Sequence, residues 1–298
     1  MMEELPENYR SGYVAIIGFP NAGKSTLLNA LLNIKLSIIS KKPQTTRRRV
    51  LGILNRDIYQ IVFVDTPGIL RPRYALQKKM MEYVRSALCD ADLILLIVDA
   101  AAKRHPVDLD LKHLNPSKKP LILLLNKIDL MSKGEVLPLI ETYKDFYPFE
   151  TIIPISALQA DGIDRLEKEM VERLPLGYPF YPPDVITDHP ERFFVAEFIR
   201  EKIFERFYQE IPYSTEVEIE IFEERQNRPD YILATIYVER KSQKGMLIGK
   251  GGEAIKSIGT AARKEIEEFL GRRVFLELRV KVNEDWRRNE IKLRRLGF

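Results

Sequence analysis

The segment from Gly18 to Ser25 combines glycine, lysine and a hydroxyl group at a spacing that can bind phosphate. Its terminal glycines let the backbone curl until its N–H groups converge on phosphate oxygens. Lys24 can then reach the β and γ phosphates, and the Ser25 hydroxyl can ligate Mg²⁺. The residues expected to shape this loop or contact the nucleotide are Gly18, Asn21, Ala22, Gly23, Lys24, Ser25 and Thr26. The alternative is an accidental match on a surface turn.

Two flanking segments favour the phosphate loop over that alternative. Residues 13–17 form an apolar run and residues 25–32 have a helical pattern, which gives the strand, loop and helix that the motif requires. Up to about residue 175, short apolar runs alternate with helical stretches. This order predicts an α/β fold with a doubly wound, mostly parallel sheet and ligand contacts at the strands' C-terminal ends. The expected strands are 14–18, 58–65, 93–99, 121–126 and 151–156.

A carboxylate and a threonine complete a predicted Mg²⁺ site. Asp65 ends an expected strand and can hold the ion through a water molecule, while the Gly68 N–H can meet a γ-phosphate. A threonine in the basic segment 41–49 could bind the ion when a nucleoside triphosphate is present, which would make the segment a switch. Motif alignment favours Thr46 over Thr45. We therefore predict Ser25, Thr46 and Asp65 as metal ligands, and a catalytic group of Lys24, Thr46, Asp65 and Gly68.

The predicted base-binding residues follow two later strands. A carboxylate at Asp129 can accept two hydrogen bonds from guanine, at N1–H and at the exocyclic amine. Adenine has an acceptor at N1 and no 2-amino group, so the same carboxylate would be left unpaired. Asn126 and Lys127 would brace the loop, and after Ser156 the Ala157 N–H could bond guanine O6. The sequence therefore predicts GTP and GDP, with Mg²⁺, as ligands.

A second glycine-rich motif lies near the C-terminus. A Gly-x-x-Gly turn between two expected helices lets the backbone approach single-stranded nucleic acid, and a lysine within it supplies charge. The candidate RNA-binding residues are Ile248, Gly249, Lys250, Gly251 and Gly252. Residues 240–298 contain 16 Lys and Arg but only 8 Asp and Glu, whereas residues 181–239 are acidic. The basic excess fits a polyanion, although solvated helix faces would give the same count.

The composition of the chain indicates the cellular compartment in which the protein is expected. No apolar run approaches the roughly 20 residues needed to span a bilayer. Cys89 is the only cysteine, so it excludes an internal disulfide and fits a reducing compartment. We expect it to be a small buried residue beside the following strand. These features predict a cytoplasmic protein without a transmembrane segment, and leave peripheral association with the inner face of a membrane open.

A proline-rich stretch divides the chain into two predicted domains. Residues 174–183 contain four prolines and a glycine, which is typical of a linker. We predict a GTP-binding domain over 1–175, a linker over 176–190, and a smaller α+β domain over 191–298 that ends in a basic helix, 284–296. In that helix, Trp286 is expected to be a packing residue.

The motifs together resemble the Era family of GTPases. The resemblance rests on residues 43–47 and 65–68, and residues 246–258 resemble the Gly-x-x-Gly core of a prokaryotic-type KH domain. It covers nearly the whole chain. It implies GTP hydrolysis linked to binding of single-stranded RNA near the 3′ end of small-subunit ribosomal RNA, and a role in small-subunit maturation. It also implies that Asn21 ligates K⁺, although a turn-stabilising role fits that residue equally well.

One departure from many small GTPases bears on the mechanism. They place a glutamine just beyond Gly68 to orient the attacking water, whereas this chain has Ile69. We therefore expect slow intrinsic hydrolysis.

Two other functions stay open. A constitutive RNA-binding ribosomal component is disfavoured by the intact nucleotide motifs. A membrane or trafficking GTPase is disfavoured by the Gly-x-x-Gly turn and by the absence of a lipidation motif at residues 296–298.

Overall fold

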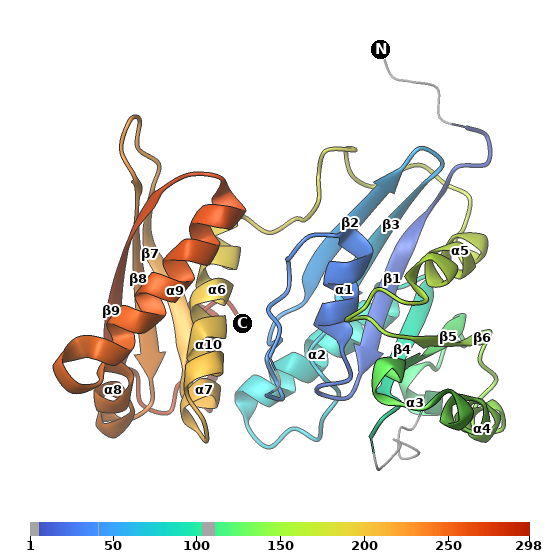
Figure 1. Ribbon diagram of the computed structural model, residues 1–298, viewed down its shortest axis with the longest axis horizontal. Coiled ribbons are helices and arrows are strands. Elements are labelled where there is room, and N and C mark those ends of the chain that lie inside the picture. Colours follow the sequence, from blue (N-terminus) through green and yellow to red (C-terminus); the bar gives the residue numbers. More distant parts are fainter. Residues whose placement is uncertain (1–5, 41, 103–110) are drawn as a thin grey trace. The chain divides into compact units, whose positions relative to one another are not determined.

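The computed structural model describes residues 6–40, 42–102 and 111–298 (Figure 1). The described chain divides into two compact units that do not follow a single cut in the sequence. The first unit comprises residues up to 37, residues 46–71 and residues 80–188. The second comprises residues 38–45, 72–79 and 189–298. Two short segments that flank the predicted nucleotide motifs therefore belong to the second unit, which the predicted domain boundaries did not anticipate.

The described part of the first unit is built on a six-stranded sheet in the order β2-β3-β1-β4-β5-β6. Neighbouring strands are parallel, except that β2 is antiparallel to β3. The strands are β1 (Arg10–Gly18), β2 (Val50–Arg56), β3 (Tyr59–Asp65), β4 (Leu93–Asp99), β5 (Leu121–Asn126) and β6 (Thr151–Ile155). The sheet is buried on both faces, so its central strands are continuous apolar runs. This confirms the predicted α/β class.

The helices of this unit connect the parallel strands and leave one sheet edge for a site. They are α1 (Lys24–Leu32), α2 (Ala75–Asp90), α3 (Leu111–Leu114), α4 (Lys133–Lys144) and α5 (Ile163–Arg173), with a short 3-10 turn, η1, at Ile128–Leu130. The first residues of α2, up to 79, fall in the second unit. Because β1, β3, β5 and β6 run parallel, their C-terminal ends lie at the same edge. All four loops predicted to bind nucleotide leave the sheet there.

Two expectations for this unit were wrong. The strand β2 was not predicted, because it follows directly on a basic segment and contains Gly52, Asn55 and Arg56, which hide its apolar pattern. Cys89 is exposed rather than buried. The buried face of α2 carries Met80, Val84, Ala87 and Leu88 at helical spacing, and position 89 falls on the opposite face.

The predicted linker contacts the first unit over most of its length. The Gln60 side chain accepts hydrogen bonds from the backbone N–H groups of Phe180 and Tyr181, at 2.7 and 3.1 Å. The Ile53 N–H donates to the Ile186 carbonyl at 2.8 Å. Residues 176–188 are therefore packed chain rather than a free tether.

The second unit has the predicted α+β fold. Its sheet has the order β7-β8-β9, in which β8 is antiparallel to β7 and parallel to β9. Helices α6 and α9 contact each other and cover one face of this sheet (Figure 1). The elements are α6 (Glu191–Arg206), α7 (Ile211–Ser214), β7 (Glu216–Glu223), β8 (Asp230–Val238), α8 (Lys241–Ile248), η2 (Lys250–Gly252), α9 (Glu253–Leu270), β9 (Val274–Val282) and α10 (Glu290–Arg295).

The expected basic helix over 284–296 is much shorter in the structure. Asp285 has a left-handed φ of 52°, which a continuous helix cannot accommodate. The helix α10 begins only after Asn289, whose side chain accepts the N–H groups of Ile291 and Lys292. Trp286 lies in the turn before it, fully buried, and donates from Nε1 to the Ser214 carbonyl at 2.9 Å. The packing role predicted for this tryptophan is therefore confirmed.

Within the residues that the structure describes, none of the helices has the length and apolar character to cross a membrane.

Candidate functional site

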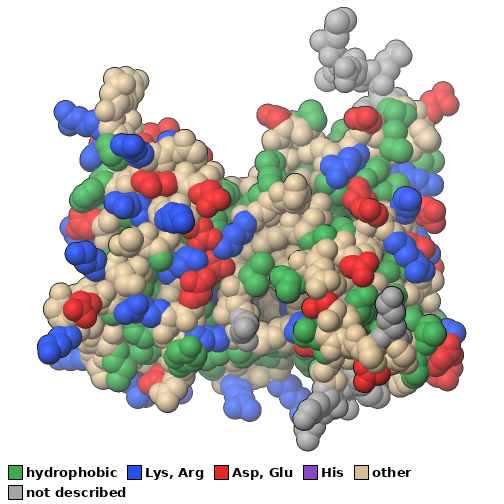
Figure 2. Space-filling view, viewed as in Figure 1, with side chains coloured by type: hydrophobic (Ala, Val, Ile, Leu, Met, Phe, Trp, Pro, Cys, Tyr) green, Lys and Arg blue, Asp and Glu red, His purple; other side chains and the backbone are tan. Residues whose placement is uncertain are grey.

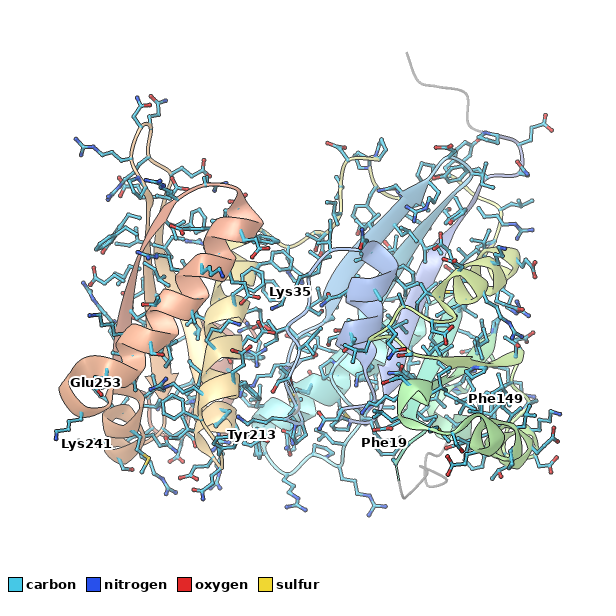
Figure 3. The ribbon with its side chains drawn as sticks, viewed as in Figure 1. Phe19, Lys35, Phe149, Tyr213, Lys241 and Glu253 are labelled. Atoms are coloured by element: carbon cyan, nitrogen blue, oxygen red, sulfur yellow. The ribbon has the colours of Figure 1, made fainter. Side chains whose placement is uncertain are left out.

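The phosphate loop leaves β1 at Gly18 and enters α1 at Lys24, as the motif predicts. Gly23 has a φ of 105°, and a Cβ placed there would lie 2.1 Å from Nδ2 of Asn126, so no larger residue fits. Lys24 is buried, and its Nζ donates to the carbonyls of Gly18, at 3.3 Å, and of Phe19, at 3.0 Å; Phe19 is labelled in Figure 3. Burial lowers the pKa of Lys24 to about 8, although the charge of Asp65 opposes this shift. Bound phosphates would stabilise its positive charge further.

The three predicted Mg²⁺ ligands lie together at the start of α1. The Ser25 hydroxyl donates to Oδ2 of Asp65 at 2.8 Å and lies 2.9 Å from Oγ1 of Thr46. Thr45 is turned away, because its hydroxyl donates to the carbonyl of Lys42 at 2.9 Å. The geometry supports the preference for Thr46 over Thr45 as a ligand, which stays a prediction.

The carboxylate of Asp65 fits a metal-bound water. Asp65 is fully buried, and its Oδ1 atom accepts no hydrogen bond of normal geometry from the part of the chain that the structure describes. Burial raises the pKa of this carboxyl, and Lys24 and the hydroxyls of Ser25 and Ser37 oppose the rise. A buried carboxylate oxygen without a partner is costly. Because Mg²⁺ prefers oxygen ligands and keeps several waters, the donors assembled here fit that ion.

Two residues that the sequence motifs did not identify support this carboxylate. The hydroxyl of Ser37 donates to the same oxygen, Oδ2 of Asp65, at 3.0 Å, and the pair is buried. The side chain of Asn29 fixes the Ser37 backbone through three hydrogen bonds in and beside that residue. An asparagine inside a helix, four residues after Ser25, was the one signal in the sequence, because asparagine is a poor residue for a helix interior.

At the base end, Asn126 joins two loops. Its Nδ2 donates to the Ala22 carbonyl at 2.8 Å, and its Oδ1 accepts the Ala157 N–H at 2.9 Å. The bracing role expected of this side chain is therefore visible as two hydrogen bonds, one to the phosphate loop and one to the last loop. The same N–H of Ala157 is directed to Asn126 here, so bonding guanine O6 with it would require this contact to be shared or broken.

The carboxylate predicted to recognise guanine, that of Asp129, is held by its neighbours. The Ser156 hydroxyl donates to Oδ1 of Asp129 at 2.6 Å, which leaves the other carboxylate oxygen for a ligand. Lys127 has a left-handed φ of 69° and pairs with Asp99 at 2.5 Å. Asp99 ends β4 and was not predicted, since it belongs to none of the nucleotide motifs. These contacts hold the 126–129 loop in place before any base is bound.

Near the expected γ-phosphate, the described residues after Gly68 provide backbone groups and no general base. The Ile69 N–H donates to the Gly18 carbonyl at 3.0 Å, which places the chain after Gly68 against the phosphate loop. The isoleucine side chain cannot orient water. Asn21 is exposed and has a φ of 64°. Such a φ also suits a turn residue, so its role as a K⁺ ligand stays a prediction. The first of the expected switch residues, Lys41, lies outside the described residues.

The Gly-x-x-Gly turn connects α8 and α9, whose first residues, Lys241 and Glu253, are labelled in Figure 3. Gly249, Gly251 and Gly252 have φ values of 75°, 59° and 80°. A Cβ built on Gly251 or Gly252 would meet no described atom within 4 Å, so the backbone of the turn faces open space. A nucleic-acid backbone can approach such a surface closely.

A groove of about 280 Å³ lies between α9 and β9. Because β9 is an edge strand, its outer backbone groups are open to a ligand. Two cations of the groove, Lys256 and Arg263, form no ion pair within the described ranges. The groove is lined by Ile255, Lys256, Gly259, Thr260, Arg263, Phe275, Leu276 and Leu278.

The charge segregation seen in the sequence is largely cancelled in space. On the face drawn in Figure 2, acidic and basic side chains of this unit are interleaved. Arg272 pairs with Asp230 at 2.5 Å, and Lys281 pairs with Glu220 at 2.6 Å. The acidic stretch before residue 240 therefore neutralises part of the basic stretch after it. The groove cations Lys256 and Arg263 are the better candidates for contact with a polyanion.

Comparison with known families and proteins finds matches for both parts of the chain. A family described as "50S ribosome-binding GTPase" matches residues 13–127, and the KH domain family matches residues 210–287. GTPase Era of Geotalea uraniireducens is 48% identical over 293 residues, which cover 98% of this chain and 99% of that protein. The chloroplastic GTPase ERA1 of Zea mays is 45% identical over 99% of this chain and 72% of its own length.

Solved structures agree with these relatives over the full fold. A single-residue variant of Aquifex aeolicus Era, bound to GDP·AlF4⁻, superposes with a TM-score of 0.93 and 43% identity, covering 97% of this chain and 99% of that one. A structure of Era with MgGDPNP and nucleotides 1506–1542 of 16S ribosomal RNA gives the same values. Identity at this level over nearly the whole length, with both motif sets in place, identifies the chain as a member of the Era GTPase family, which hydrolyses GTP.

Proposed function

We propose that this protein binds GTP or GDP with Mg²⁺, hydrolyses GTP, and couples the nucleotide state to binding of single-stranded RNA near the 3′ end of small-subunit ribosomal RNA. This activity would serve assembly of the small ribosomal subunit. The observation that carries the proposal is the convergence of Ser25, Thr46 and Asp65 on a chain that also presents an open Gly-x-x-Gly turn. The Era structure solved with MgGDPNP and a 16S fragment supports it by family membership.

The chain's own groups account for binding and orientation of the nucleotide. Lys24 and the loop N–H groups would bind the phosphates, and Ser25 and Thr46 would hold Mg²⁺, which would neutralise charge on the β and γ phosphates. Asp129 would accept from guanine, with Ser156 fixing the carboxylate. Adenine would leave that carboxylate unpaired, which is the basis of selectivity.

Hydrolysis would proceed without a side-chain base, because Ile69 stands where a water-orienting glutamine is found in many small GTPases. A slow intrinsic rate is therefore expected. If Asn21 ligates K⁺, the ion would add positive charge beside the phosphates. Rates in K⁺ well above those in Na⁺, and loss of that difference in Asn21→Ala, would support this role. Equal rates in the two salts would exclude it and favour the turn-stabilising role.

RNA binding would centre on the glycine turn and the α9–β9 groove. The exposed backbone at Gly251 and Gly252 can approach a single strand, while Lys250, Lys256 and Arg263 supply positive charge. The aromatic ring of Phe275 is exposed in the same groove and offers a stacking surface.

Crosslinking in cell extract followed by sequencing of the attached RNA tests the partner directly. The proposal predicts reads concentrated near the 3′ end of small-subunit ribosomal RNA. A dominant peak in large-subunit RNA would contradict it and would favour the broader description of the GTPase family that matches residues 13–127. In a parallel test, co-sedimentation with acidic liposomes but no gel shift with RNA would favour the membrane function instead.

Contacts within the second unit suggest how the nucleotide state would reach the RNA surface. The segment 38–45, which leads into Thr46, is held by α6: Lys42 donates to the carbonyls of Phe204 and Phe207, and the Ile39 N–H donates to Glu201 at 2.9 Å. In the segment 72–79, the Leu76 N–H donates to the Arg287 carbonyl at 2.9 Å. Ordering of Thr46 by GTP would therefore alter the hydrogen bonds that these two segments make to the KH fold.

A further inference from the structure

The hydroxyl of Ser37 occupies a special position relative to the predicted Mg²⁺ site. It donates to Oδ2 of Asp65 at 3.0 Å, and the Ser25 hydroxyl donates to that same oxygen at 2.8 Å. With Oδ2 engaged twice, the rotation of the carboxylate about its Cβ–Cγ bond is fixed. The other oxygen, Oδ1, is buried and is left without a protein hydrogen bond of normal geometry among the described residues. One oxygen is thus held by the protein, and one is left for a ligand.

The two hydroxyl groups do not have the same task. Ser25 would direct its oxygen to the ion, so its geometry changes when Mg²⁺ arrives and leaves. Ser37 is not among the predicted ligands: its hydroxyl donates to Asp65, whereas the Ser25 hydroxyl also lies 2.9 Å from Oγ1 of Thr46, another predicted ligand. Its hydrogen bond to Asp65 can persist in both states. It is therefore the constant support of the carboxylate.

Ser37 is itself fixed by α1. Oδ1 of Asn29 accepts the N–H groups of Leu36, at 3.0 Å, and of Ser37, at 2.9 Å. Nδ2 of the same side chain donates to the Ser37 carbonyl at 2.8 Å. One amide thus satisfies three backbone groups around the serine. Buried backbone groups need hydrogen-bond partners, but these need not all come from one side chain. Three partners from a single side chain are expected where the position of the Ser37 hydroxyl matters.

We propose that Ser37 is a positioning residue that, held by Asn29, orients Asp65 toward the hydration shell of Mg²⁺ and so strengthens metal binding in the nucleotide complex. The inference rests on the proposed function, since it requires Mg²⁺ at Ser25 and Thr46. Residues that orient a metal ligand typically change metal affinity by about 10- to 100-fold when removed. We expect the lower end here, because Ser25 still holds the same carboxylate oxygen.

The test measures release of a fluorescent GDP analogue from the full chain over a series of free Mg²⁺ concentrations, beginning in excess EDTA. In Ser37→Ala, the Mg²⁺ concentration that half-maximally slows release should rise by about tenfold. The release rate in EDTA should stay within about twofold of wild type, because the phosphate and base contacts are intact. Ser37→Thr, which keeps the hydroxyl, should recover most of the loss, and Asn29→Ala should reproduce it in part.

A matched control is Ser11→Ala, which removes another buried hydroxyl in the same unit, one that donates to the Tyr178 carbonyl at 2.6 Å. It should lower thermal stability without moving the Mg²⁺ dependence.

An unchanged Mg²⁺ midpoint in folded Ser37→Ala, or faster release in EDTA to the same degree as in Mg²⁺, would overturn the inference. If wild type itself showed no Mg²⁺ dependence, the proposed function would fail instead. If Ser37→Ala does not fold, comparison of Ser37→Thr with Ser37→Cys decides, since the weak thiol donor should raise the midpoint and the hydroxyl should not.

Discussion

The predicted nucleotide site and the glycine turn are built in opposite ways. In the first, side chains bond one another before any ligand is present: Asn126 links two loops, and Ser156 holds Asp129. In the second, Gly251 and Gly252 leave the backbone bare and nothing described lies within 4 Å of the missing Cβ atoms. A preorganised site suits recognition of one base among similar ones. An open backbone suits a flexible strand, whose shape the protein does not need to anticipate.

The largest expected effect comes from Asp129→Asn, which tests whether side-chain preorganisation sets specificity. The amide replaces a charged acceptor of two hydrogen bonds, so GTP affinity should fall by about 100-fold or more. Xanthine carries a carbonyl where guanine carries its amine, so XTP should bind the variant better than GTP. Competition binding with the two nucleotides measures both changes. A variant that keeps its preference for GTP would show that the base is recognised elsewhere.

The next effect tests the backbone-led site. Gly252→Ala places a methyl group on the exposed turn at a φ of 80° and should weaken RNA binding by about tenfold, as expected from the loss of one close contact to a charged strand. Gly271→Ala is a matched control, because Gly271 has a φ of 66° and open space around its missing Cβ but ends α9 away from the turn. Equal loss of RNA affinity in both variants, measured by gel shift, would mean that strain rather than contact is responsible.

A smaller effect concerns the link between the two regions. Lys42→Ala removes donors to the C-terminal carbonyls of α6, where a cation is favourable. The ratio of RNA affinities measured with the two nucleotides should fall by about threefold, which corresponds to the energy typical of one such contact. GTP affinity should stay nearly unchanged. Fluorescence titration with each nucleotide gives the ratio. A ratio equal to that of wild type would exclude this contact from the coupling.

The smallest effects should come from single cations of the groove. Lys256→Ala and Arg263→Ala should each lower RNA affinity by about two- to fivefold and reduce the salt slope by about one. Lys281→Ala is the control, since Lys281 already pairs with Glu220. If the control changed the salt slope as much as the groove variants, RNA binding would depend on the net charge of the protein rather than on the groove.

The sequence predicted the parts of this molecule in which the pattern is local. Five strands of the first sheet, the phosphate loop and the Gly-x-x-Gly turn between two helices could be identified because apolar runs and glycine positions are visible within a few neighbouring residues. Contacts that join distant segments could not. Ser37 and Asp99 lie in no motif, and their partners, Asp65 and Lys127, are 28 residues away in each case. The division into units was also hidden, because segments 38–45 and 72–79 pack with residues far along the chain.

The wrong expectations for Cys89 and for the basic tail have the same origin. Cys89 was judged by residue type, whereas the facing of α2 decides its exposure. The basic tail was interpreted as one helix from its composition, although Asp285 in a left-handed conformation interrupts it. In both cases the packing of neighbouring elements overrode what the local sequence favoured. In the tail, this packing includes the buried side chain of Trp286.

The most direct test of the account is RNA affinity measured on one protein preparation with a non-hydrolysable GTP analogue and with GDP, both in saturating Mg²⁺. Coupling between the nucleotide state and RNA binding predicts binding tighter by about fivefold or more with the analogue, the lower end of typical coupling between two sites. Affinities that agree within about twofold would contradict it, because two ligands coupled by less than that are in effect independent.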